Sequence, residues 1–172
     1  MFNEINNLNN LVSYFRLSFI HEITFVETNI TDIIHREISS LRSKFRAKKI
    51  SIRLESNNLQ STYCCAEFLS YCIRNILRNA LNYAQSRSEL TIQDQIIIHE
   101  SNKYLKLEFI HPVEHFNVEN LQKSCTPFYS SDPSRTGMGL SLCQEIILLM
   151  NGHFAIDGLS GPSVRTTITL PV

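Results

Sequence analysis

Three asparagines in the middle of the chain have a spacing that could hold a metal ion. Asn75 and Asn79 are four residues apart and Asn82 follows three residues later, so all three share one face if this segment is helical. Amide oxygens held rigidly on a helix are neutral ligands for a hard cation such as Mg²⁺, which prefers oxygen. The same spacing is also typical of a polar helix face that meets only solvent, so spacing alone leaves both interpretations open.

A second stretch, Thr136-Gly137-Met138-Gly139, has the composition of a phosphate-binding turn. Two glycines at the start of a helix let the backbone approach an anion, and the free N–H groups and the helix dipole attract it. A glycine pair also occurs in plain loop-to-helix turns, so this motif alone is weak. Together, on opposite sides of an irregular loop, the two stretches predict a metal–phosphate site.

Periodicity predicts the elements that would position these groups. Helices are predicted from Thr31 and Asp32, the expected cap residues, to about residue 49, and over 67–84 and 136–150. Alternation predicts strands at 50–54, 96–98, 104–110, 154–157 and 164–170, and an irregular segment spans 111–135. Because strands and helices mix without strict βαβ alternation, we expect an α/β two-layer sandwich of one mixed sheet and about three helices, preceded by an N-terminal helix.

The first predicted helix has an apolar seam that needs a partner. Five apolar residues follow one another at steps of three and four, namely Ile5, Leu8, Val12, Phe15 and Phe19. This is the spacing of a coiled-coil seam, although two heptads fit an ordinary amphipathic helix equally well.

Composition narrows the class of protein. The chain has 172 residues, 43% of them hydrophobic, which suits one domain with a real core, and 16 basic residues balance 16 acidic ones. A chain without net charge creates no long-range electrostatic field that would attract nucleic acid or acidic lipid, so we expect no nucleic-acid partner. Five cysteines without CxxC spacing predict reduced packing thiols, and no apolar run approaches the length of a membrane helix, so the expected location is cytoplasmic.

The order of these motifs resembles the catalytic ATP-binding domain of sensor histidine kinases, a Bergerat-type ATPase fold shared in looser form with Hsp90, type II topoisomerases and MutL. The resemblance rests on the asparagine helix, the loop ending in Gly137-Met138-Gly139-Leu140 and the terminal stretch 166–171. It implies an ATP-binding domain over residues 29–172, preceded by the end of a dimerisation helix and a linker over 1–28. It also implies Mg-ATP as cofactor, a response regulator receiver domain as partner, and a homodimer through dimerisation helices, in the cytoplasmic part of a membrane sensor.

The resemblance assigns roles to residues around the phosphates. Asn79 matches the asparagine that binds Mg²⁺, and Asn75 matches its partner one turn earlier. Gly137 and Gly139 match the second glycine box at the triphosphate, and Arg135 beside it is expected to contribute positive charge.

Three further residues match positions around the rest of the nucleotide. Tyr83 matches the aromatic residue beside the nucleotide, and Phe128 matches the aromatic residue that anchors the lid over ATP. Thr167 matches a threonine near the base pocket.

The first glycine box of that family, Asp-x-Gly-x-Gly, is degenerate in this sequence. The aspartate position holds His111, and the glycine positions hold Val113 and His115. A neutral imidazole accepts a hydrogen bond from the adenine amine in only one tautomer, and an unpaired buried donor costs ~1–3 kcal/mol. We therefore expect ATP binding to be weakened by about two orders of magnitude, or lost, which leaves either Mg-ATP or no cofactor at all.

The phosphorylated histidine is expected on a separate helix. His21 sits in a stretch that resembles the phosphoacceptor box, but it lies too few residues before Asn79 for the helical hairpin that should intervene. The sequence thus predicts a histidine kinase catalytic domain or, alternatively, a pseudokinase or histidine-phosphotransferase-like scaffold that binds a receiver domain or a partner kinase without ATP. A serine kinase of the anti-sigma type is disfavoured by the apolar seam of the first helix.

Overall fold

The computed structural model describes residues 24–55, 61–114, 121, 123–130 and 136–172. The predicted helix over 5–19 and two predicted site residues, His115 and Arg135, lie outside these described residues. Among the described residues, no helix is both long and apolar enough to cross a membrane.

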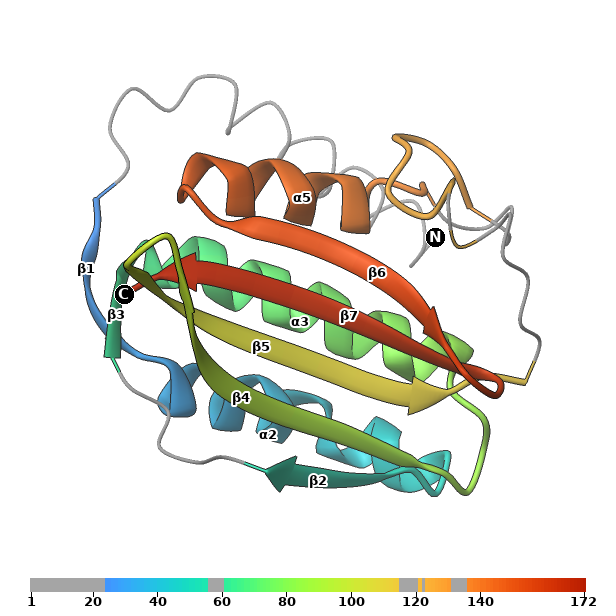
Figure 1. Ribbon diagram of the computed structural model, residues 1–172. Helices are drawn as coiled ribbons and strands as arrows, with labels where there is room; N and C mark the ends of the chain where they lie inside the picture. Colours follow the sequence, from blue (N-terminus) through green and yellow to red (C-terminus); the bar gives the residue numbers. More distant parts are fainter. Residues whose placement is uncertain (1–23, 56–60, 115–120, 122, 131–135) are drawn as a thin grey trace.

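A five-stranded mixed sheet forms one layer of the domain (Figure 1). Its strands lie in the order β2 (Ser51–Glu55), β4 (Glu89–His99), β5 (Asn102–Pro112), β7 (Ser163–Pro171) and β6 (His153–Leu159). Strand β2 pairs with β4 in parallel, and the other neighbours are antiparallel. The predicted α/β sandwich with one mixed sheet is confirmed.

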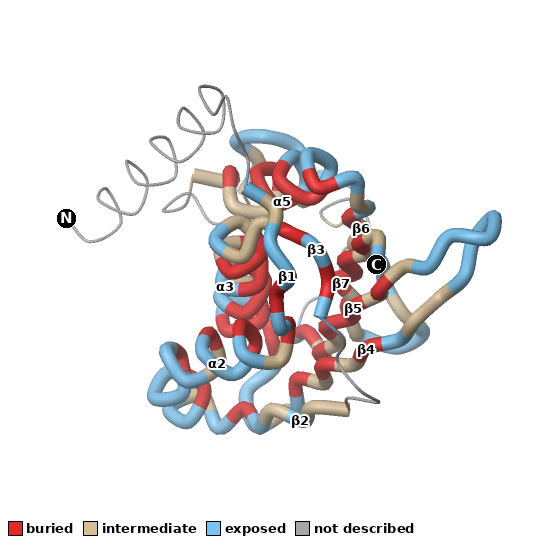
Figure 2. Tube along the Cα trace, turned by 90° about the vertical axis from the view of Figure 1, so that its left-hand side faces the viewer, coloured by how far each residue is buried: buried red, intermediate tan, exposed pale blue. Residues whose placement is uncertain are grey.

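Three helices form the second layer, namely α2 (Ile30–Ala47), α3 (Ala66–Tyr83) and α5 (Gly139–Leu149), and all lie against the same face of the sheet (Figure 1). The core lies between the layers, and Figure 2 shows the buried residues along the facing sides of helices and strands. Strand β5 alternates as expected for such a sheet, with Leu105, Leu107 and Phe109 buried beneath the helices. Because α3 is the central helix, it contacts both α2 and α5.

A small two-stranded sheet, β1 (Val26–Asn29) with β3 (Ser61–Cys64), was not predicted. Each strand has only four residues, too few to show alternation in the sequence. Thr62 donates from its hydroxyl to the Pro171 carbonyl oxygen at 2.7 Å, which attaches this sheet to the end of β7.

The start of α2 differs from the prediction. The cap is Asn29, whose Oδ1 accepts from the backbone N–H of Thr31 at 2.9 Å and of Asp32 at 3.4 Å. Thr31 and Asp32, the predicted caps, therefore lie inside the first helical turn, which suits the carboxylate of Asp32 because the helix N-terminus favours negative charge.

Strands β4 and β5 are longer than predicted. Strand β4 begins at Glu89, seven residues before the predicted start at 96, and β5 continues through His111 and Pro112, where an irregular segment was expected. The two strands form a hairpin, and its turn lies at Glu100 and Ser101, both with positive φ.

Cys72 of α3 and Cys143 of α5 meet where these two helices cross. The Cys72 thiol lies 3.9 Å from the Cys143 carbonyl oxygen, and the Cys143 thiol lies 3.8 Å from the Cys72 carbonyl oxygen. Both side chains are fully buried and all five cysteines are free, as predicted for packing thiols. A small side chain at each position lets the two helix backbones approach closely.

Candidate functional site

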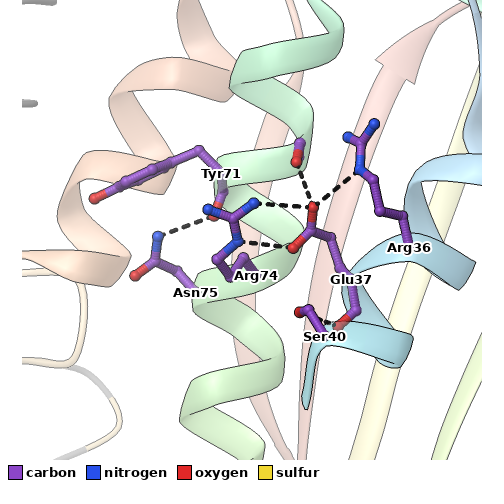
Figure 3. A network of polar contacts seen from close by, with 7 residues as sticks. Arg36, Glu37, Ser40, Tyr71, Arg74 and Asn75 are labelled. Atoms are coloured by element: carbon purple, nitrogen blue, oxygen red, sulfur yellow. Dashed lines mark hydrogen bonds and ion pairs between the residues drawn. The ribbon is translucent and has the colours of Figure 1, made fainter. Parts of the chain in front are cut away.

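Helix α3 presents Asn75 in a fixed orientation. The opposite side of the helix is buried through Leu69, Ile73 and Leu77, so the asparagine face points away from the core. Asn75 donates from Nδ2 to the Tyr71 carbonyl oxygen at 2.9 Å (Figure 3). Because the amide nitrogen is committed to this bond, the Asn75 Oδ1 atom is the acceptor left for the site. Asn79 is half-buried on the same face one turn later.

The start of α5 faces this amide. A Cβ placed on Gly139 would lie 3.1 Å from Asn75 Oδ1, closer than ordinary van der Waals contact. The cap residue Met138 supplies no side-chain acceptor to the first turn of α5. The structure therefore brings together an amide oxygen and the N-terminus of a helix, whose first N–H groups have no intrahelical acceptor.

Gly137 brings the preceding loop to the same place. Its φ is +66°, in the left-handed region, and a Cβ there would collide with the Tyr129 carbonyl oxygen and lie 2.6 Å from the Phe128 carbonyl carbon. Only glycine fits this close backbone contact without strain. The predicted lid residue Phe128 is thereby placed beside the glycine loop, and the residue is 70% exposed.

The other two predicted nucleotide residues are Tyr83, at the end of α3, and Thr167, in β7. Tyr83 is the last residue of α3 and is 38% exposed. Thr167 pairs with Glu108 across β5 and β7, one residue away from the buried Phe109 and Ile168, so its side chain is on the sheet face away from the helices. The structure does not bring Thr167 together with Asn75 and Gly139, which lie on the helical side.

The segment predicted to be a degenerate glycine box begins at the end of β5, where His111 is only 3% exposed. Burial lowers the pKa of the His111 imidazole, which keeps the ring neutral, although the backbone contact with Pro112 acts in the opposite direction. His111 Nδ1 lies 3.5 Å from the Pro112 carbonyl oxygen, an atom that can only accept. This contact favours the tautomer with the proton on Nδ1, which leaves Nε2 as an acceptor.

Val113 continues the strand-like backbone of the box. It forms an isolated bridge with Ala84 at the end of α3, and its N–H donates to the Pro162 carbonyl oxygen at 2.7 Å. Its side chain is buried. The position that was matched to a glycine of the first glycine box therefore carries an aliphatic side chain packed into the domain.

A polar network between α2 and α3 was missed by the sequence analysis. The Glu37 carboxylate is 1% exposed and accepts from Arg74 and Ser70 (Figure 3). The sequence contains one indication of this network, a charged residue on an apolar helix face. Glu37 lies one turn from each of the buried residues Ile34 and Leu41.

The residues present fit a metal–phosphate group. Among the described residues no group of three or more His, Cys, Asp or Glu side chains is placed to hold a metal ion. Amide and phosphate oxygens suit Mg²⁺, which keeps several waters and takes few protein ligands. Gly137 and Gly139 leave the space that side chains would otherwise fill.

Comparisons with known proteins identify the family of the chain. The family described as "Histidine kinase-, DNA gyrase B-, and HSP90-like ATPase" matches residues 65–172. Sporulation kinase D of Bacillus subtilis (strain 168) is 26% identical over 172 residues, which cover 98% of this chain and 33% of the relative. Sensor histidine kinase ZraS of Salmonella typhi is 24% identical over 180 residues, covering 100% of this chain and 37% of the relative. The chain thus spans about a third of the length of these curated relatives.

Solved structures share the fold. Full-length ShkA in complex with AMPPNP has a TM-score of 0.84 at 14% identity, over 98% of this chain and 36% of that one. The catalytic domain of histidine kinase ThkA has a TM-score of 0.75 at 19% identity, over 86% of this chain and 95% of that one. Since the family match covers well over half of the sequence, the chain belongs to the histidine kinase-, DNA gyrase B- and HSP90-like ATPase family, as a catalytic ATP-binding domain of the kind found in two-component sensor histidine kinases.

Proposed function

We propose that this domain binds Mg-ATP and transfers its γ-phosphoryl group to a histidine on a separate helix. The observation that supports the proposal is the closeness of Asn75 Oδ1 to Gly139, 3.1 Å from the place that a Cβ would take there, which brings the asparagine face beside the glycine pair. In this proposal Asn79 holds the metal ion with Asn75 beside it, and the N–H groups at the start of α5 hold the phosphates. A bound Mg²⁺ would supply charge neutralisation of the phosphates, which phosphoryl transfer requires.

The remaining residue roles follow the same proposal. Arg135 is proposed to add positive charge at the phosphates, Tyr83 to lie beside the nucleotide, and Phe128 to anchor the lid. Thr167, which matches a threonine near the base pocket, has its side chain on the sheet face away from the helices, so we assign it no contact with the phosphates.

We further propose that ATP affinity is lower than in a domain with an intact first glycine box. His111 and Val113 are both buried side chains where the resembling box has a carboxylate and a glycine. The buried imidazole is neutral and has no charge to strengthen a hydrogen bond from the adenine amine, and charge-assisted hydrogen bonds are roughly twice as strong as neutral ones. The added side chains at Val113 and His115 also restrict the approach of a base to the backbone.

The biological setting is proposed from the same family. Residues 29–172 would form the ATP-binding domain and residues 1–28 the end of a dimerisation helix with its linker, within a homodimer. A response regulator receiver domain is the proposed partner, supported by the crystal structure of histidine kinase ThkA in complex with the response regulator protein TrrA.

Calorimetric titration with Mg-ADP tests the proposal. We expect saturable but weak binding, abolished by Asn79→Ala. The triple variant His111→Asp, Val113→Gly, His115→Gly should bind at least tenfold more tightly. Micromolar affinity in the unchanged protein would contradict the weakened site, and a rebuilt box without any gain would contradict the placement of the degenerate motif.

A scaffold without ATP is the second candidate function, and the buried Val113 side chain favours it. Such a scaffold would bind a receiver domain or a partner kinase through its surface. Complete absence of Mg-ADP binding in both the unchanged protein and the rebuilt variant, with the fold intact, would select this function.

A further inference from the structure

The Glu37 carboxylate joins α2 to α3 through bonds to both of its oxygens. Glu37 Oε2 accepts from Arg74 Nε at 2.7 Å, and Oε1 accepts from Arg74 Nη2 at 3.1 Å and from the Ser70 hydroxyl at 2.6 Å (Figure 3). Arg36, the neighbour of Glu37 on α2, adds a longer contact at 3.4 Å. With 1% of the side chain exposed, this carboxylate has its shorter bonds to α3 and only the longer contact to Arg36 on its own helix.

These bonds fix α3 in two directions. Ser70 and Arg74 are one helical turn apart, so a carboxylate that reaches both defines the position of α3 along its axis as well as its rotation. The aliphatic contacts of α3 lack this precision, because hydrophobic burial is non-directional. A displaced α3 would leave the Glu37 charge buried and unpaired, which is strongly unfavourable.

The site depends on that same part of α3. Asn75 directly follows Arg74, and its Nδ2 bond to Tyr71 and its contact with Gly139 lie within one turn of the Glu37 bonds. A rotation of α3 by about 20° would move an atom about 5 Å from the helix axis by about 2 Å. A shift of this size is comparable with the 3.1 Å between Asn75 Oδ1 and the place that a Cβ would take on Gly139, so it would change the geometry of the site.

We propose that Glu37 is a positioning residue of the metal–nucleotide site: by binding Arg74 and Ser70, it holds the asparagine face of α3 in place beside Gly139 at the start of α5. The proposal rests on the proposed function for the identity of the ligand. Glu37 itself lies between α2 and α3 and acts through Arg74, on the side of α3 that faces α2.

The experiment compares Glu37→Gln with Leu41→Ala in the full 172-residue chain. Glu37→Gln keeps the shape of the side chain and removes its charge. Leu41 is buried in the hydrophobic core on α2 one turn later and its side chain has no polar atom, so Leu41→Ala weakens α2 packing without removing a hydrogen bond to Arg74. Two quantities are measured on folded protein, namely Mg-ADP affinity by calorimetry and the NMR resonances of the Asn75 side-chain amide without nucleotide.

We expect Glu37→Gln to shift the Asn75 amide resonances and to lower Mg-ADP affinity at least fivefold, while the weaker binding of ADP without Mg²⁺ changes less. Leu41→Ala should lower the unfolding temperature and leave both site measurements unchanged. Ser70→Ala, which removes a single donor, should give a smaller effect in the same direction, and it carries the test if Glu37→Gln does not fold.

The proposal is overturned if Glu37→Gln leaves the Asn75 resonances and the affinity as in the unchanged protein, or if Leu41→Ala produces an equal loss. Failure of the proposed function has a different signature. In that case the unchanged protein does not bind Mg-ADP, yet the Asn75 resonances still report whether Glu37 positions this side chain.

Discussion

The Oδ1 atom of Asn75 lies 3.1 Å from the place that a Cβ would take on Gly139. Two residues 64 positions apart in the sequence thus form the centre of the candidate site, one on the middle helix and one at the start of the last helix. Neither residue is distinctive alone, since a polar helix face and a glycine near a helix start are both common.

Alanine at the two glycines should separate stability from binding. Gly139→Ala adds a Cβ that meets only the end of the Asn75 side chain, at a helix start where alanine is favourable, so the free energy of unfolding should change by less than about 1 kcal/mol while Mg-nucleotide affinity falls. Gly137→Ala forces a left-handed residue against the Tyr129 backbone and should cost about 2 kcal/mol or more. Urea denaturation and calorimetry measure the two effects, and equal destabilisation by both variants would contradict this difference.

Loss of the α2 cap should destabilise the domain. Asn29→Ala removes the acceptor of the Thr31 and Asp32 N–H groups and should lower the free energy of unfolding by about 0.5–2 kcal/mol. Thr31→Ala is the matched control, since it lies inside the helix and should change stability by less than about 0.5 kcal/mol. If urea denaturation showed a larger loss of stability for Thr31→Ala than for Asn29→Ala, Thr31 would be the cap instead.

The five thiols should differ in their reaction with an alkylating agent. Cys65 and Cys125 are partly exposed and should react in the native protein, whereas Cys72 and Cys143 are fully buried. Burial and the neighbouring Cys143 thiol raise the pKa of Cys72, so little thiolate is present to react. Mass spectrometry should show Cys72 and Cys143 modified about a thousandfold more slowly, at a rate set by unfolding. Early modification of either would contradict the packing at the α3–α5 crossing.

Acid should destabilise the protein partly through Glu37. Burial acts to raise the pKa of the Glu37 carboxyl, but hydrogen bonds from Arg74 and Ser70 and the charge of Arg74 outweigh it, so the pKa is below its ordinary value of 4.5. A carboxyl group whose pKa is lowered by folding stabilises the fold at pH values above its pKa in the unfolded protein. This stabilisation is lost as the pH falls through the pKa of the group in the folded protein. Stability should therefore fall below about pH 4.5, and less steeply in Glu37→Gln. Identical pH profiles of the two proteins in thermal unfolding would contradict this contribution.

Several elements were predictable because their signal is local. The apolar spacing of α3 and the alternation of β5 can both be recognised within a single short segment of the sequence. The residues concerned are buried, namely Leu69, Ile73 and Leu77 in α3 and Leu105 and Leu107 in β5. The cap of α2 was misplaced by two residues because Asn29, Thr31 and Asp32 are all acceptable cap types. Strands β1 and β3 were missed because pairing between distant four-residue segments leaves no periodic signal.

The amino-acid sequence alone determined the α/β sandwich, the asparagine face and the glycine pair, because helix period, strand alternation and backbone freedom of glycine are properties of neighbouring residues. Only the tertiary structure decided that Asn75 meets Gly139, that Glu37 finds Arg74 and Ser70, and that Thr167 turns away from the helices. The physical reason is that these contacts depend on how α2, α3, α5 and the sheet pack together. Packing joins residues whose separation along the chain carries no information about their distance in space.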